Sequence, residues 1–213
     1  MRFSEGSIGP PGPMNRRDFL RLSGIAGAAL VLGVVGTGEL FAQEGSPYSL
    51  LVQEFEEAAA KYDVPVSLLL AMGYVNTRWE MPPPEASAHR PGDPQGRGAY
   101  GIMQLVRNDD EDTLGEASRL TGISEEELKT DRRSNILGGA ALLREAQGER
   151  PIRLGDYFGA VSGKGRRRLF KAVSGIGAGD LYAEQVFAVL RRGTYERILD
   201  GEEIVLPSQE GEI

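Results

Sequence analysis

A run of apolar residues from Val66 to Trp79 constrains the fold more than any other feature of the sequence. Pro65 suits the first turn of a helix, where a backbone N–H is not needed. The run Val66-Ser67-Leu68-Leu69-Leu70-Ala71-Met72 is apolar on nearly every side of that helix, so the helix is unsuited to a surface. We therefore expect it at the centre of a domain, with other helices packed around it.

The segments around this run have the one-sided apolar pattern of helices that cover a core. Residues 50–62 place apolar side chains on one helical stripe, with acidic side chains opposite. Ser124 and Glu127 match a capping box at the start of another helix. Only Ile204-Val205-Leu206 alternates with the period of a strand, and it does so weakly. The predicted class is therefore all-α, with further helices at residues 110–120, 132–147, 154–160, 166–173 and 181–191.

The N-terminal residues have the features of an export signal. Asn15-Arg16-Arg17-Asp18-Phe19-Leu20-Arg21 precedes an uncharged, Gly- and Ala-rich stretch from Leu22 to Gly38. That stretch falls short of the roughly 20 strongly apolar residues of a bilayer span and fits the apolar region of a signal. The paired arginines followed by Phe-Leu resemble the twin-arginine translocation motif. The resemblance implies export of the folded protein to the cell envelope or beyond, with no stable membrane span after processing; an uncleaved anchor is the alternative.

Composition excludes several classes of function. The 213 residues carry a net charge of −7, whereas a nucleic-acid-binding face needs an excess of basic residues, so no nucleic acid is expected as a partner. The chain has no cysteine and one histidine, His89, which leaves too few ligands for an ordinary catalytic zinc site. We expect no metal and no cofactor. The lack of disulfides agrees with folding before export.

The chain divides into three segments by composition. We assign residues 1–43 to the signal and residues 44–193 to one helical domain, whose length suits a single core. Residues 194–213 are polar and acidic, and we interpret them as a tail or linker. The Pro- and Gly-rich stretch 82–98 is the longest irregular segment of the domain, and long loops inside compact domains are usually functional or mobile.

Four stretches in the helical domain resemble, in order and spacing, the lysozyme-like soluble lytic transglycosylase domain. The resemblance covers about residues 55–193 and implies a lysozyme-like helical fold that acts on peptidoglycan glycan strands. A closer likeness, through 74–79, 101–103 and 182–193, is to the helical segment before the amidase domain of some exported N-acetylmuramoyl-L-alanine amidases. No amidase domain is present, and one histidine cannot form its zinc site. The four stretches are Ala58 to Trp79, Ala99-Tyr100-Gly101-Ile102-Met103-Gln104-Leu105, Asp131 to Leu143 with Asn135-Ile136, and Tyr157 to Gly163.

The same resemblance indicates where cleavage of a sugar linkage would take place. The family uses one glutamate, at the end of the central helix, to protonate the leaving oxygen and then to accept a proton from the sugar. Asn76-Thr77 occupies the place of the family's Glu-Ser pair. An amide does not titrate in the useful range, so Asn76 cannot act as the general acid. Ala160-Val161-Ser162-Gly163 also stands where the family has Tyr-Asn-Ala-Gly, and we expect cleavage to be impaired or lost.

Other residues could take part in the same site. Glu80, one helical turn after Asn76, and Glu85, in the following loop, are the candidate substitute acids, although each could equally be a solvated carboxylate. By resemblance, Met103 and Gln104 would contact sugar. Tyr100 and Trp79 offer flat faces for stacking on sugar rings, with burial in the core as the alternative. Asn135 is expected to hold backbone near the site, and the Gly138-Gly139 pair to permit close helix packing.

The sequence thus predicts an exported, peptidoglycan-interacting protein whose glycosidic cleavage is impaired or lost. Two alternatives remain at this stage. One is an active lytic transglycosylase or muramidase that uses Glu80 or Glu85. The other is a non-enzymatic scaffold that recruits a wall enzyme. No oligomeric state is assigned.

Overall fold

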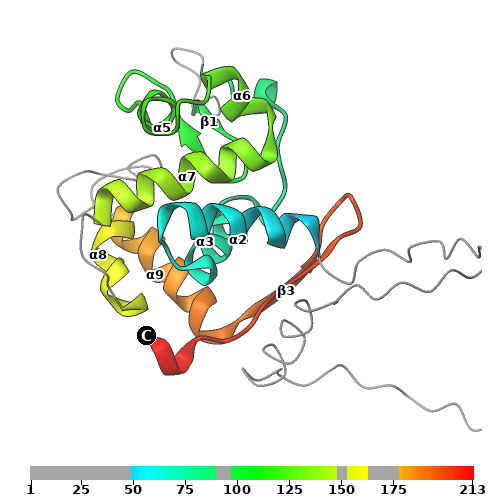
Figure 1. Cartoon of the computed structure of the whole chain (residues 1–213), viewed down its shortest axis with the longest axis vertical. Coiled ribbons are helices and arrows are strands. Elements are labelled where there is room, and N and C mark those ends of the chain that lie inside the picture. Colours follow the sequence, from blue (N-terminus) through cyan, green and yellow to red (C-terminus); the bar gives the residue numbers. More distant parts are fainter. Residues whose placement is uncertain (1–48, 90–96, 148–152, 163–177) are drawn as a thin grey trace, which may run out of the picture. The chain divides into compact units, whose positions relative to one another are not determined.

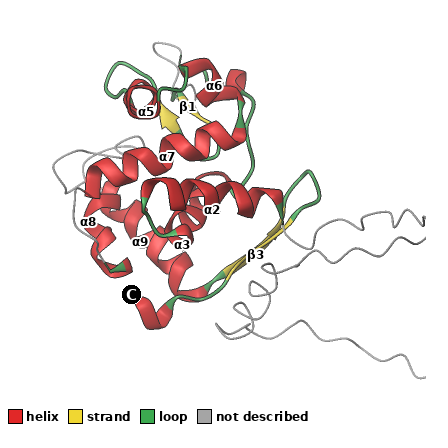
Figure 2. Ribbon diagram, in the orientation of Figure 1, coloured by secondary structure: helices red, strands yellow, loops and turns green. Residues whose placement is uncertain are grey.

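The computed structural model describes residues 49–89, 97–147, 153–162 and 178–213, and these are mostly helical (Figures 1 and 2). The predicted all-α class is confirmed at this level, with two small two-stranded sheets added to it. The signal segment, the helix predicted at 166–173 and Gly163 lie outside the described residues. The helices are α2 (Leu50–Tyr62), α3 (Val66–Thr77), α4 (Pro84–Ser87), α5 (Thr113–Thr121), α6 (Glu125–Thr130), α7 (Arg132–Gln147), α8 (Phe158–Val161) and α9 (Ala178–Arg192), with 3-10 turns η1 (Leu154–Tyr157) and η2 (Glu210–Glu212).

Helix α3 is the central helix that the sequence predicts. Its residues from Leu68 to Gly73 are buried on all sides, and the helix packs against α2 and α9. It ends at Thr77, two residues earlier than expected, because Arg78 and Trp79 adopt left-handed backbone conformations. The Trp79 amide donates to the Gly73 carbonyl at 3.3 Å, which closes the helix.

Helix α7 forms a second layer over α2 and α5. Its Gly138-Gly139 pair permits the close packing that we expected. A Cβ atom at Gly139 would lie 2.7 Å from Met103 Cγ, and one at Gly138 would lie 3.0 Å from Leu105 and Leu128. The helix begins as predicted, since the Asp131 carboxylate accepts from the Ser134 amide at 2.7 Å.

A short hairpin lies between α4 and α5. Strand β1 (Ala99–Tyr100) pairs antiparallel with β2 (Leu105–Val106), with Tyr100 opposite Leu105. The turn between them, residues 101–104, occupies the second stretch of the family resemblance. We did not predict these strands, because two residues are too few for an alternating pattern to be visible.

Residues 194–213, expected to be a tail or linker, form part of the same folded unit as the helices. Strand β3 (Thr194–Arg197) pairs antiparallel with β4 (Glu203–Leu206), and η2 follows. Ile198, Ile204 and Leu206 are each at most 4% exposed and join the hydrophobic core. The acidic residues around these apolar positions, Glu202 and Glu203 among them, suggested a solvated tail and concealed the buried strand.

None of the helices in the described ranges combines the length and apolar character that crossing a membrane requires.

Candidate functional site

The end of α3 and the turn 101–104 share an unusual backbone. Three of the four described non-glycine residues with positive φ lie here: Arg78 at 53°, Trp79 at 65° and Gln104 at 54°. Arg78 is the C-cap of α3, where a left-handed backbone is common. Trp79 and Gln104 are not C-caps, and a positive φ is uncommon for such residues. Such conformations cost on the order of 1–3 kcal/mol and gather at functional sites. The backbone therefore points to the region around Asn76.

Asn76 is half-buried at the end of α3, between two other elements. Its Nδ2 donates to the Ile102 carbonyl at 3.4 Å, and its side chain shares a hydrogen bond with the Tyr182 hydroxyl of α9. Burial raises the pKa of Tyr182 well above its ordinary value, and the hydrogen bond to Asn76 opposes this only in part. Both groups are therefore neutral at ordinary pH, and neither supplies an acid.

Asn135 of α7 holds the turn beside Asn76 in place. Its Oδ1 accepts from the Met103 amide at 2.7 Å, while its Nδ2 donates to the carbonyls of Tyr100 at 3.1 Å and Leu128 at 2.8 Å. The side chain is fully buried. Gly101 has φ 69°, and a Cβ there would lie 2.2 Å from Asn135 Nδ2, so only glycine fits. The expected role of Asn135 in holding backbone is confirmed.

The residues expected to contact sugar are mostly inside the protein. Trp79 and Met103 are fully buried, and Tyr100 is 8% exposed. The Trp79 indole donates to the Leu70 carbonyl at 2.7 Å, and because the side chain is fully buried, neither ring face is open for stacking on a sugar. The ammonium of Lys129 lies 5.1 Å from the centre of the Tyr100 ring. The stacking predicted for these aromatic residues therefore gives way to packing, and sequence alone could not separate the two, since both use flat apolar rings.

Gln104 is the exception among these candidates. It is half-buried, and its Nε2 donates to the Gly101 carbonyl at 2.9 Å. Asn76 donates to the next carbonyl, that of Ile102. Two side-chain amides thus meet consecutive carbonyls of one turn, and together with Tyr182 they form the candidate site.

The two candidate substitute acids have other surroundings. Glu80 Oε1 accepts from the Leu199 amide at the β3–β4 turn, at 2.8 Å, so this carboxylate fastens two distant segments together. Glu85 is exposed on the single-turn helix α4. His89 lies near Asp109, with Nε2 3.4 Å from the carboxylate. Within the described ranges, no group of three His, Asp or Glu side chains could hold a metal ion.

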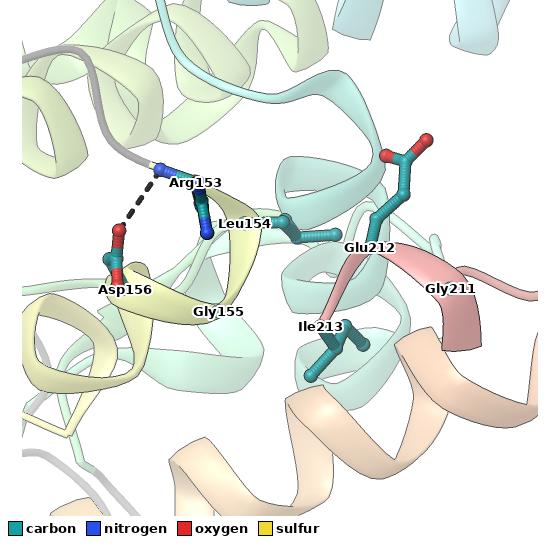
Figure 3. A pocket seen from close by; sticks show the side chains of 7 residues that line it. All are labelled: Arg153, Leu154, Gly155, Asp156, Gly211, Glu212 and Ile213. Carbon is teal, nitrogen blue, oxygen red and sulfur yellow. Dashed lines mark hydrogen bonds between the residues drawn. The ribbon is translucent and has the colours of Figure 1, made fainter.

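A hollow of about 640 Å³ lies elsewhere, between η1 and the last residues of the chain (Figure 3). On its rim the Arg153 amide donates to the Asp156 carboxylate at 3.2 Å, as the dashed line shows. It contains none of the residues that the sequence indicated. Its lining is Arg153, Leu154, Gly155, Asp156, Gly211, Glu212 and Ile213.

Sequence reasoning missed two residues that the structure makes prominent. Tyr182 reads as one more member of the apolar stripe of α9, and only the fold shows that its hydroxyl reaches Asn76. Arg132 reads as an ordinary charge at a helix start, but its side chain is only 19% exposed and meets three carboxylates. Contacts between segments so far apart in the chain leave no local pattern in it.

One comparison with known proteins gives a match. The family model of the twin-arginine translocation pathway signal sequence matches residues 13–33, which confirms the predicted signal. The chain is accordingly exported by the twin-arginine route, to the cell envelope or beyond. No curated protein matches the chain.

Proposed function

We propose that this protein is an exported lysozyme-like domain that binds peptidoglycan glycan strands without cleaving them. One observation carries the proposal. Asn76 stands half-buried at the end of the central helix, held by the Ile102 carbonyl and the Tyr182 hydroxyl, where a cleavage reaction would need a carboxylic acid.

The chemistry explains why this position decides the activity. A sugar alkoxide is a poor leaving group, so an acid must protonate it as the bond breaks, and an amide cannot. Amides do suit binding, because each offers both donors and acceptors to sugar hydroxyls without a charge to desolvate. Asn76 and Gln104 together supply such groups around one turn.

The lysozyme-like part of the proposal rests on how the resembling stretches meet in space. A buried central helix ends at Asn76, the turn 101–104 lies against that end, and Asn135 of a third stretch fixes the turn. Segments that resemble the family separately are thus joined by hydrogen bonds to each other. This supports the resemblance beyond the order of the motifs in the chain.

The enzyme alternative is less favoured by the same contacts. Glu80 already accepts a backbone hydrogen bond from Leu199, and Glu85 is exposed on the surface. Glycosidases instead keep their acid in an apolar, desolvated setting. Glu80→Gln and Glu85→Gln test this alternative directly, since loss of a measured lytic activity in either variant would establish it.

Co-sedimentation with purified, insoluble peptidoglycan tests the binding. We expect the folded wild-type protein to be retained in the pellet at low salt. Gln104→Ala should weaken retention by about 2- to 10-fold, the worth of one net hydrogen bond. Gln185→Ala, on the exposed side of α9, is the matched control and should leave retention unchanged. If the wild-type protein stays in the supernatant, it does not bind peptidoglycan, and the scaffold alternative replaces the proposal.

A further inference from the structure

The β3–β4 hairpin crosses from the end of α9 to the start of α2 (Figure 1). At its tip, the Glu202 carboxylate accepts hydrogen bonds from the Ser49 hydroxyl and, at 3.0 Å, from the Leu51 amide. Ser49 is the N-cap of α2, and its hydroxyl accepts from the Val52 amide. Glu202 therefore accepts from a second amide of the first turn of α2, beside the Ser49 cap, although it lies 151 positions away in the chain.

Arg132, the first residue of α7, joins this tip to the helices. Its Nε lies 2.7 Å from Glu54 of α2, and its Nη1 lies 3.1 Å from Asp200 and 3.3 Å from Glu202 on the hairpin. The side chains of Glu54, Arg132 and Glu202 are at most 20% exposed, so their attraction is screened less than that of a surface pair. The hairpin tip is thus held by charge, whereas its middle is held by buried Ile204 and Leu206.

The same hairpin also reaches the segment that follows Asn76. The Leu199 amide donates to Glu80, and Arg78 pairs with Glu196 at 3.5 Å. Arg78 and Trp79, between Asn76 and Glu80, are two of the residues with positive φ. A backbone with such φ values persists only when contacts from the surrounding structure hold it in place. The hairpin supplies two of them.

We propose that the β3–β4 hairpin is an acid-released strap, closed by Glu202 on Arg132 and the start of α2, that holds the turn after Asn76. Protonation of Glu202 removes its charge from Arg132 and weakens its bonds to Ser49 and Leu51. The tip then leaves α2, the Leu199 amide leaves Glu80, and the turn carrying Trp79 loosens. The inference concerns the strap alone and does not depend on glycan binding.

The direction of the pH dependence follows from the groups that face Glu202. Burial alone would raise the pKa of Glu202, but hydrogen bonds from Ser49 and Leu51 and the charge of Arg132 hold it below its ordinary value of 4.5. A carboxylate whose pKa is lowered on folding stabilises the fold above its ordinary pKa and loses that contribution as the pH falls through the lowered one. The strap is therefore closed at neutral pH and opens as the pH falls through the lowered pKa of Glu202. Glu54 and Asp200 are the other two carboxylates that contact Arg132.

Hydrogen exchange of the full protein at neutral pH tests the closing contact. Glu202→Gln should raise exchange at the start of α2, in β3–β4 and around Glu80 by about 10-fold or more, because it removes charged hydrogen bonds. Glu203→Gln is the matched control, since it removes the same charge from the exposed side of the hairpin. Equal exchange in the two variants would overturn the strap.

Trp79 provides a second test that needs no variant. It is the one tryptophan of the chain, it is fully buried, and it precedes Glu80. As the wild-type protein is acidified from about pH 7 to about pH 3, acrylamide should begin to quench Trp79 before the helical circular dichroism signal is lost. Quenching that appears only together with loss of helix would show global unfolding and would contradict the strap.

Discussion

Two half-buried polar regions of this molecule are built in opposite ways. Around Asn76, neutral groups meet each other: two side-chain amides, a tyrosine hydroxyl and backbone carbonyls. Around Arg132, a guanidinium meets three carboxylates, one of which also caps α2. The first contains Asn76, the position at which our proposal would require an acid for cleavage. The second lies where no catalysis was expected.

The difference shows which of the two regions is held together by charged groups. The hydrogen bonds of the neutral region should not themselves depend on pH over a wide range, because none of the groups that form them changes protonation state there. The charged region should weaken in acid. The carboxylates around Arg132 therefore fasten elements together, whereas Asn76 offers no proton donor at the position where our proposal would require one for cleavage. Each variant below removes a contact in one of the two regions.

The largest effect is expected in the neutral region, from Asn135→Ala. The change leaves the Met103 amide and the Tyr100 and Leu128 carbonyls without their buried partner. We expect the free energy of unfolding to fall by about 3–4 kcal/mol, measured by urea denaturation. Asn108→Ala, which removes hydrogen bonds in an exposed turn, serves as control and should cost at most about 1 kcal/mol. Equal losses in both variants would mean that Asn135 does not organise the site.

In the charged region, Arg132→Met should lower the free energy of unfolding by about 2 kcal/mol, because it strands partly buried carboxylates. Arg133→Met is the neighbouring control. Arg133 pairs with Glu57, but both side chains are more than half exposed, so its loss should cost less than about 0.5 kcal/mol. Urea denaturation of the two variants at low and high salt measures the contrast. A smaller loss for Arg132→Met than for Arg133→Met would show that the cluster does not hold the fold.

The pH dependence separates the two regions further. At neutral pH, Glu202→Gln should be less stable than wild type by about 1–2 kcal/mol, the worth of hydrogen bonds to a charged group. The gap should close as the pH falls below the ordinary pKa of 4.5, because the wild-type carboxylate then loses its own charge. Thermal unfolding of both proteins across this range gives the gap at each pH. A gap that stays constant in acid would exclude Glu202 as the titrating group.

The smallest effect is expected from Tyr182→Phe, which removes the hydroxyl that meets Asn76. Loss of one buried hydrogen bond should cost about 1 kcal/mol, and this cost should not change with pH. Tyr195→Phe, on a side chain that is 55% exposed, is the control and should be close to neutral. A cost for Tyr182→Phe that grew in acid would indicate a charged partner in the neutral region.

The sequence predicted the helices well, because their signals are local. The apolar run that forms α3, the Asp131 cap and the Gly138-Gly139 contacts all follow from spacing and residue type within a few positions. The hairpin 194–206 was missed for a physical reason. Strand β4 buries alternate residues, Ile204 and Leu206, in the core, while acidic residues such as Glu202 and Glu203 beside them suggested a tail.

The candidate site could be predicted only in part. Asn76, Gln104 and Asn135 were found through the resemblance, and the structure brings them to one turn. For Trp79 and Tyr100 the sequence left stacking on sugar and burial in the core as alternatives, because aromatic residues in a core and in a groove look the same in a sequence, and the structure buries both side chains. The sequence also could not show which backbone amide each carboxylate contacts. Glu80, for example, accepts from the Leu199 amide, which lies 119 positions away in the chain.

Release of soluble muropeptides from purified peptidoglycan, compared between the wild type and Asn76→Glu, decides whether position 76 is the missing acid. We expect no release by the wild type above the buffer blank. In Asn76→Glu, where a carboxyl group stands beside the Tyr182 hydroxyl, release should rise by about 10²-fold or more. Release by the wild type that persists in Asn76→Ala would contradict the proposal, because another group would then be donating the proton.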